Sequence, residues 1–206
     1  MKFPQACVLM FAKEPVAGKV KTRLITSLGA DGAKDLHIQL LQRQIDVLEH
    51  SSLCHKQLWV NANPQHSVFK KFSGERKRQS GADLGEKMCN AAKSALQDFK
   101  QVVIIGSDCP DIDEAYLQQA LEALVSGNDV VLGPAQDGGY VLVGLSRLIP
   151  EIFEDVSWGS EKVLRQTQSR LQANNIVWQE LPERFDIDRP EDLEKLSAFD
   201  LIPEYK

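Results

Sequence analysis

The sequence predicts a three-layer α/β/α fold built on a mainly parallel, mixed sheet. Short apolar runs recur along the chain, and most are continuous, which is typical of strands that helices cover on both faces. Amphipathic helical patterns lie between most of these runs, and strands alternating with helices indicate a parallel sheet. The chain has 206 residues, 43% hydrophobic and 26% charged, so we expect one domain over residues 1–206.

Six apolar runs are predicted as strands. In chain order they are ACVLMFA (6–12), QLWVNA (57–62), VVIIG (102–106), DVVLGPA (129–135), YVLVGL (140–145) and NIVWQEL (175–181). The polar stretch SGERKRQSG (73–81) is predicted as a loop or a short edge strand, because it is rich in charged residues and flanked by Gly and Ser.

Helices are predicted between these strands. Over residues 31–50, leucine and isoleucine recur at steps of three to five, and Asp31 is placed to cap the first turn. Similar patterns predict a helix over 83–99, one after Asp113, one after Ser160 and a last one that starts at Pro190. Ligands of such sheets bind at the carboxyl ends of the strands, so the loops there are the candidate sites.

Charge and cysteine content narrow the class of protein. A net charge of −5 argues against a nucleic acid or an anionic membrane as partner, since both select a basic surface. The four cysteines show no CxxC pair, which favours reduced thiols and a cytoplasmic location. The apolar stretch at the N-terminus is too short for a signal peptide, and no run approaches a membrane span.

The first predicted loop is basic. In FAKEPVAGKVKTRL (11–24) the cations stand close to Gly18, which permits close backbone approach; they are Lys13, Lys19, Lys21 and Arg23. The order of Gly, Lys and Thr does not match a P-loop. Such a loop either binds a polyanion or is a solvated surface loop, and its place directly after a buried strand favours binding.

Carboxylates stand out at two other places in the sequence. Asp108 comes directly after the strand VVIIG, and Asp186 and Asp188 share one face of the extended stretch RFDIDRP. Asp188 is also placed to cap the helix that starts at Pro190, which makes Asp186 the preferred partner of Asp108. Carboxylates without histidine suit Mg²⁺ or Mn²⁺. The alternative is that such residues only cap helices, which we favour for Asp111 and Asp113.

Two glycine-containing segments are open to two interpretations. Asp137 and Gly138 form a strong hairpin signal, but the same loop could place Asp137 against an acceptor hydroxyl. Gly81 and Gly85 flank a helix start, where backbone N–H groups either read a base edge or only form the cap.

Five segments taken together closely resemble a bacterial family of transferases, often labelled glycosyltransferases, of the nucleotide-diphospho-sugar transferase superfamily. They are FAKEPVAGKVKTRL, GADLGEKM, IGSDCPDI, LGPAQDGGYVLVGL and FDIDRPEDL, and they span nearly the whole chain. The superfamily includes guanylyltransferases of cofactor synthesis, among them that of molybdenum cofactor. The resemblance implies a GT-A fold. The G-x-G-x-R-M loop of nucleotidyltransferases is absent, and the D-x-D of many glycosyltransferases is reduced to Ser107-Asp108.

The resemblance also implies roles for individual residues. Donor phosphates are assigned to the first loop, through Lys13, Gly18, Lys21 and Arg23. The base is assigned to the region of Gly81 and Asp83, and the metal to Asp108 with Asp186 or Asp188. Lys21, Asp108 and Asp137 are the expected catalytic residues.

We therefore expect a transferase that depends on Mg²⁺ or Mn²⁺ and moves the sugar of a nucleotide-sugar to a small acceptor. The first alternative is a nucleotidyltransferase, which joins a nucleoside triphosphate to a phosphorylated small molecule and releases pyrophosphate. The second is a protein that binds nucleotides without turnover. The number of chains in the assembly is left open.

Overall fold

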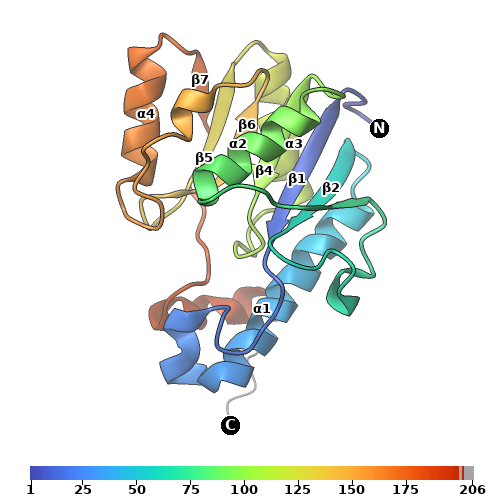
Figure 1. Ribbon diagram of the computed structural model, residues 1–206, viewed down its shortest axis with the longest axis vertical. Helices are drawn as coiled ribbons and strands as arrows, with labels where there is room; N and C mark the ends of the chain where they lie inside the picture. The colour runs from blue at the N-terminus through green and yellow to red at the C-terminus, as the bar shows by residue number, and fades with distance from the viewer. Residues whose placement is uncertain (200, 202–206) are drawn as a thin grey trace.

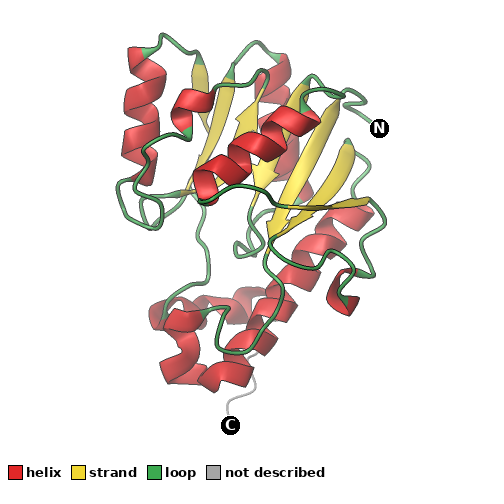
Figure 2. Cartoon of the chain, in the orientation of Figure 1, coloured by secondary structure: helices red, strands yellow, loops and turns green. Residues whose placement is uncertain are grey.

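A computed structural model describes residues 1–199 and 201, and it confirms the predicted three-layer α/β/α arrangement (Figures 1 and 2). The sheet has seven strands, which are β1 (Ala6–Ala12), β2 (His55–Val60), β3 (Glu75–Arg78), β4 (Gln101–Ile105), β5 (Val130–Pro134), β6 (Tyr140–Leu145) and β7 (Trp178–Glu180). Their order across the sheet is β3-β2-β1-β4-β6-β5-β7. β6 runs antiparallel to β4 and β5, and the other pairs are parallel.

Within residues 1–199, four α-helices cover the two faces of the sheet. They are α1 (Ile25–His50), α2 (Leu84–Ala95), α3 (Glu114–Val125) and α4 (Val163–Ala173). α1 and α3 pack on one face, while α2 and α4 pack on the other. Each of the six runs predicted as strands overlaps one, and the polar stretch 73–81 contains the short edge strand β3. Charged residues on this edge discourage pairing with another chain.

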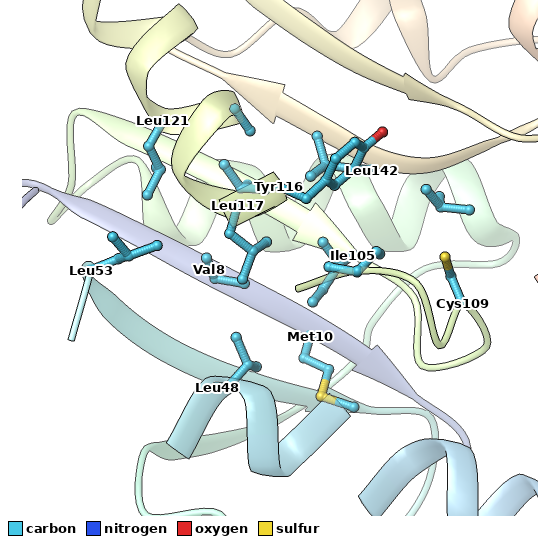
Figure 3. Packing of buried hydrophobic residues seen from close by; sticks show 14 of the residues in the cluster. Val8, Met10, Leu48, Leu53, Ile105, Cys109, Tyr116, Leu117, Leu121 and Leu142 are labelled. Atoms are coloured by element: carbon cyan, nitrogen blue, oxygen red, sulfur yellow. The ribbon is translucent and has the colours of Figure 1, made fainter. Parts of the chain in front are cut away.

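The core follows from the alternation of side chains along the buried strands. All of β1 is buried, and its side chains point alternately to the two faces. Val8 and Met10 pack toward α1 and α3, in one cluster with Leu48 and Leu117 (Figure 3). Cys7 and Leu9 belong to the cluster under α2 and α4. Because each fully buried Leu or Met contributes about 1.5–3 kcal/mol, covering both faces supplies most of the stability of the fold.

The first helix starts earlier than predicted. The pattern places its start at Asp31, but α1 begins at Ile25 and its backbone breaks at Gly29, where φ is 71°. Glycine adopts this left-handed conformation readily, so the chain bends there without strain. Asp31 lies just after this kink, where its carboxylate accepts a hydrogen bond from Lys34.

Other helix boundaries also differ from the sequence prediction. α2 ends at Ala95 and not at Phe99, and the segment from Pro190 to Phe199 is a 3-10 helix. Asp113 caps α3, as predicted, because its carboxylate accepts from the backbone N–H of Tyr116. Asp111 instead forms an ion pair with Arg184, with 3.4 Å between the charged atoms.

A small third cluster of apolar residues lies below the sheet. The first half of α1 packs there against the 3-10 helix Pro190–Phe199, and the chain passes between them after β1 (Figure 1). Its buried members include Leu24, Leu36, Ile187 and Leu196. This cluster fixes the segments on both sides of the candidate site to α1. None of the helices in residues 1–199 is long and apolar enough to cross a membrane.

Candidate active site

The candidate active site lies at the carboxyl ends of β1 and β4, which are neighbours in the sheet. From β1 the chain continues outward to β2 and β3, and from β4 it continues to the other side of the sheet. Ligands of open α/β sheets bind where the order reverses in this way. Three segments meet there: the loop after β1 (13–21), the loop after β4 (106–112) and residues 184–188.

Lys21 connects all three segments. Its backbone is left-handed, with φ of 47°, and its side chain is buried. The Nζ atom lies 3.0 Å from Oδ1 of Asp108 and donates to the carbonyl oxygen of Ile187 at 2.5 Å. The backbone N–H of Ile187 in turn donates to the carbonyl oxygen of Asp108 at 3.0 Å. Lys21 therefore lies at the predicted place, but its ammonium group is directed toward Asp108 and the protein backbone.

A buried histidine, His37 of α1, completes the surroundings of Asp108. Its Nε2 atom lies 3.0 Å from the carbonyl oxygen of Lys13, and its Nδ1 atom lies 3.8 Å from Oδ1 of Asp108. Burial by itself raises the pKa of Asp108, but Lys21 and His37 together hold this pKa well below its usual range. Asp108 is therefore a carboxylate at any physiological pH.

The sequence prediction missed His37 and a second polar residue of α1, Gln44. Gln44 is fully buried, and its Nε2 atom donates to the carbonyl oxygen of Cys109 at 2.6 Å. Arg43, one residue earlier, donates through Nε to the carbonyl oxygen of Pro110 at 2.9 Å. Both bonds hold the loop that carries Asp108. The available signal was a pair of polar residues at positions 37 and 44 on the otherwise apolar face of a predicted helix.

Asp137 and Asp186 line the same pocket as Asp108. Burial, and after it repulsion from Asp137 and Asp108, together raise the pKa of Asp186 to about 6, although Lys21 opposes them. Asp137 lies in the turn between β5 and β6, where its Oδ1 atom accepts from the N–H of Gly139. The predicted hairpin is therefore present, and the same turn brings Asp137 to the pocket.

Arg23 and Asp188 form an ion pair with each other, and both are next in sequence to buried members of the third cluster, Leu24 and Ile187. Asp188 was predicted as a possible helix cap, but the hydrogen bonds at this helix start run the other way: Asp192 in the first turn accepts from the backbone N–H groups of Asp188 and Arg189, which precede the helix. Asp188 instead balances the charge of Arg23. Asp186 is directed to the pocket that Asp108 lines, and of these two carboxylates it is the one that the structure brings to Asp108.

The remaining predicted residues lie on exposed turns. Lys13 and Gly18 are exposed in the first loop, and a side chain at Gly18 would meet open space. Asp83 caps α2 by accepting from Glu86, and Gly81 has a φ of 140° with no room for a Cβ atom beside Glu86. Gly81 and Asp83 therefore have a clear structural role, and their predicted contact with a base stays a prediction.

The carboxylates of Asp108 and Asp186 could hold a cation as a pair. Among residues 1–199, no group of three or more His, Cys, Asp or Glu side chains is arranged to hold a metal by itself. A site built on this pair therefore needs further oxygen ligands from water or phosphate, which is the coordination that Mg²⁺ commonly uses. The repulsion that contributes to the raised pKa of Asp186 is what a bound cation would relieve.

Comparison with solved structures finds the same fold in transferases. The chain is 32% identical to a "putative nucleotide-diphospho-sugar transferase" from Desulfovibrio desulfuricans G20, with a TM-score of 0.82 over 91% of this chain and 84% of that chain. A cytidylyltransferase from Leptospira borgpetersenii is 17% identical, with a TM-score of 0.63 over 98% of this chain and 90% of that chain.

A third structure with this fold is the 4-diphosphocytidyl-2C-methyl-D-erythritol synthase of Anaerococcus prevotii. It is 10% identical, with a TM-score of 0.64 over 95% of this chain and 98% of that chain. The search of curated proteins finds no match. A family model, described as "Uncharacterized protein conserved in bacteria (DUF2064)", matches residues 33–160. The chain therefore belongs to the DUF2064 family, and it has the fold of the nucleotide-diphospho-sugar transferases.

Proposed function

We propose that this chain is a metal-dependent transferase that uses a nucleotide-activated donor and moves the donor's sugar to a small acceptor. The observation that carries this proposal is the ion pair between Lys21 and Asp108 at the carboxyl ends of β1 and β4. Through this pair the basic loop after β1 contacts Asp108, an ionised carboxylate that lines one pocket together with a second carboxylate, Asp186. The likeness to the Desulfovibrio desulfuricans protein described as a "putative nucleotide-diphospho-sugar transferase" supports the same activity.

In this proposal the first loop binds the donor's diphosphate. Lys13 and Arg23 are exposed, and Gly18 has open space around it, so phosphate oxygens can approach the loop. Arg23 can exchange Asp188 for a phosphate, because its side chain is about half exposed. Lys21 acts on Asp108: its buried ammonium group keeps that carboxylate ionised and in place. The base lies toward Gly81 and Asp83, at the start of α2.

Asp108 and Asp186 would hold Mg²⁺ or Mn²⁺ in this proposal. The bound cation would neutralise the negative charge that develops on the diphosphate leaving group. Asp137 lines the same pocket as Asp108 and Asp186, and in this proposal its carboxylate orients an acceptor hydroxyl and accepts its proton. Both tasks need ionised carboxylates, so the proposal predicts loss of activity as Asp186 takes up a proton.

Nucleotidyl transfer is the second candidate, because the cytidylyltransferase of Leptospira borgpetersenii shares the fold. The two reactions differ in what leaves the donor. Sugar transfer releases a nucleoside diphosphate, whereas nucleotidyl transfer consumes a nucleoside triphosphate and releases pyrophosphate.

A thermal-shift screen with and without Mn²⁺ tests the proposal, because a ligand that binds only the folded state raises its melting temperature. The screen covers nucleoside mono-, di- and triphosphates and the common nucleotide-sugars. We expect a metal-dependent shift with one nucleotide-sugar. A preference for one triphosphate would select nucleotidyl transfer, and binding without turnover in the presence of varied acceptors would indicate a binding protein.

Asp186→Asn tests the metal site in the same assay. The variant keeps the shape of the side chain but removes its charge, and we expect the metal-dependent part of the shift to disappear. Asp98→Asn is the matched control, because Asp98 is exposed beyond the end of α2. An unchanged shift in Asp186→Asn would remove this residue from the metal site.

A further inference from the structure

The pocket beside the carboxylates has an apolar wall that the proposed donor site does not use. It has a volume of about 260 Å³ and lies between α2, the end of β4 and the chain that leads into α4. Its lining includes the apolar or aromatic side chains of Phe11, Leu84, Met88, Tyr140 and Trp158, together with the carboxylates of Asp108, Asp137 and Asp186. A ligand here would lie among both carboxylates and aromatic rings.

The aromatic wall is held firmly in place. Trp158 packs edge to face on Tyr140, with 6.2 Å between ring centroids and 88° between ring planes. The indole also lies against Gly85 of α2, where a Cβ atom would come within 2.6 Å of its Nε1 atom. The turn that carries Trp158 is fixed by Gln166, whose Oε1 atom accepts from the N–H of Ser157 at 2.8 Å. The indole is therefore a preformed surface, which suits an apolar ring, a C–H face or a cation.

The size of the pocket limits the ligand. An apolar cavity of about 150 Å³ holds benzene, so the volume of this pocket corresponds to about ten nonhydrogen atoms. A single small ring with a short substituent fills it. A nucleotide does not fit inside, which leaves the pocket for the second substrate.

The charge of the pocket limits the ligand further. Three carboxylates line it, and among the lining residues that the structure describes there is no Lys, Arg or His. Lys21 is close, but it is buried and paired with Asp108. A divalent cation would add two positive charges, which the donor's diphosphate would offset, so the pocket stays negative when both are bound. Like charges in such a site disfavour a phosphorylated ligand.

We propose that this pocket binds the acceptor, and that the acceptor is a small uncharged or cationic molecule with an apolar face that stacks on Trp158. The inference rests on the proposed function, and it favours sugar transfer, because the alternative reaction needs a phosphorylated acceptor. Asp137 then meets the polar end of the acceptor, while Trp158 holds its apolar face.

Three probes that share a phenyl ring test this inference: 2-phenylethanol, 2-phenylethylamine and phenyl phosphate. Their dissociation constants are measured on the full chain at pH 8 by NMR, from the indole N–H signals of the tryptophans. We expect the amine and the alcohol to bind at least tenfold more tightly than the phosphate. Equal or tighter binding of the phosphate, or no binding of the alcohol and the amine, would overturn the inference. This comparison needs no variant and does not depend on how a variant folds.

Variants then locate the binding. Trp158→Ala is expected to weaken the alcohol and the amine by about tenfold. Trp178→Phe is the matched control, since Trp178 lies on β7 and does not line the pocket. Asp137→Asn is expected to reduce the preference for the amine over the alcohol. If Trp158→Ala leaves all three constants unchanged, the stacking surface is refuted.

The nucleotide screen on the same samples separates the two proposals. If the probes bind in the expected order but no nucleotide shifts the melting temperature, the preference of the pocket stands and the use of a nucleotide-activated donor is refuted. If a nucleotide raises the melting temperature in a metal-dependent way but the probes do not bind in the expected order, the acceptor class is refuted and the proposed function stands.

Discussion

Lys21 and Asp108 form one ion pair, but their side chains differ in exposure: 2% of the Lys21 side chain is accessible, against 43% of the Asp108 side chain. Water can solvate Asp108 if its partner is removed. It cannot reach Lys21, whose remaining hydrogen bond is to the carbonyl oxygen of Ile187. Removing Lys21 and removing Asp108 should therefore have unequal effects on the free energy of unfolding.

We expect Asp108→Ala to lower the free energy of unfolding more than Lys21→Met does. Loss of Asp108 leaves a buried ammonium group without its counter-charge, which costs about 3 kcal/mol, whereas loss of Lys21 leaves a carboxylate that water reaches. Urea unfolding of both variants measures the difference. If Lys21→Met is the less stable variant, Lys21 contributes mainly through packing and its bond to Ile187.

The charge of Asp186, in contrast, lowers the stability of the fold. Its pKa in the folded chain is about 6, above the value near 4 of an ordinary aspartate. Between about pH 4 and pH 6 the folded chain holds a proton that the unfolded chain has lost, so stability falls as the pH rises through this window. Above pH 6 the full cost of the charge is present.

Asp186→Asn removes this cost, so the variant should melt higher than the wild type at pH 8, by roughly 5 °C. The two melting temperatures should converge as the pH falls toward 4. Thermal unfolding from pH 4 to pH 8 measures both curves, with Asp98→Asn as the exposed control. A difference that is the same at every pH would mean that the charge of Asp186 does not carry the effect.

At the scale of elements, helix α1 both covers the sheet and positions the loop after β4. Its buried face carries Leu40, Leu41 and Ile45 for packing, but His37 and Gln44 for contacts with the candidate site. The two carbonyl groups that Gln44 contacts, those of Cys109 and Ile112, lie on either side of the turn after Asp108. Gln44 is thus a positioning residue for Asp108.

Gln44→Met keeps the length of the side chain and removes its donor. We expect a loss of about 1–3 kcal/mol in stability, because the carbonyl group of Cys109 becomes unpaired, together with weaker metal-dependent nucleotide binding. Binding of nucleotide without metal should change less, and this contrast separates positioning of Asp108 from a general loss of structure. Gln42→Met is the control, since Gln42 is exposed on the same helix. Equal losses with and without metal would argue against a role in positioning.

Elements with strong local patterns were predictable, and those set by tertiary contacts were not. The continuous apolar runs identified their strands, and Asp-Gly identified the turn between β5 and β6. The start of α1 was missed because Gly29 interrupts the helix, so the first turns have no regular pattern of their own. His37 was missed because a polar residue on an apolar helix face is explained only by what packs on it, here the backbone of Lys13 and the carboxylate of Asp108.

At the scale of the whole molecule, the candidate site depends on three segments that are far apart in sequence. The loop after β1, the loop after β4 and residues 184–188 meet through Lys21, Asp108 and Ile187. The sequence predicted the first two segments at strand ends, and the fold confirms this; it predicted Asp186 and Asp188 only on an extended stretch before the last helix. It could not predict that Lys21 would face Asp108 and Arg23 would face Asp188, because those pairings depend on the third cluster and on the register of the full sheet.

A ligand that contacts all three segments should stabilise them together. We expect Mn²⁺ with the nucleotide that gives the largest thermal shift, at 100 times its dissociation constant, to slow amide hydrogen exchange about 100-fold in residues 13–24, 106–112 and 184–188. Amides at the far end of α4 that exchange by local fraying provide the control, because their opening leaves the site intact. Slowing in the first loop alone would mean that the nucleotide binds there without engaging Asp108 or Asp186. In the other outcome, the wild type shows slowing in all three segments, and Asp186→Asn loses it in residues 106–112 and 184–188 but keeps it in the first loop. That result would identify the metal, held by these carboxylates, as the link between the donor's phosphates and the rest of the site.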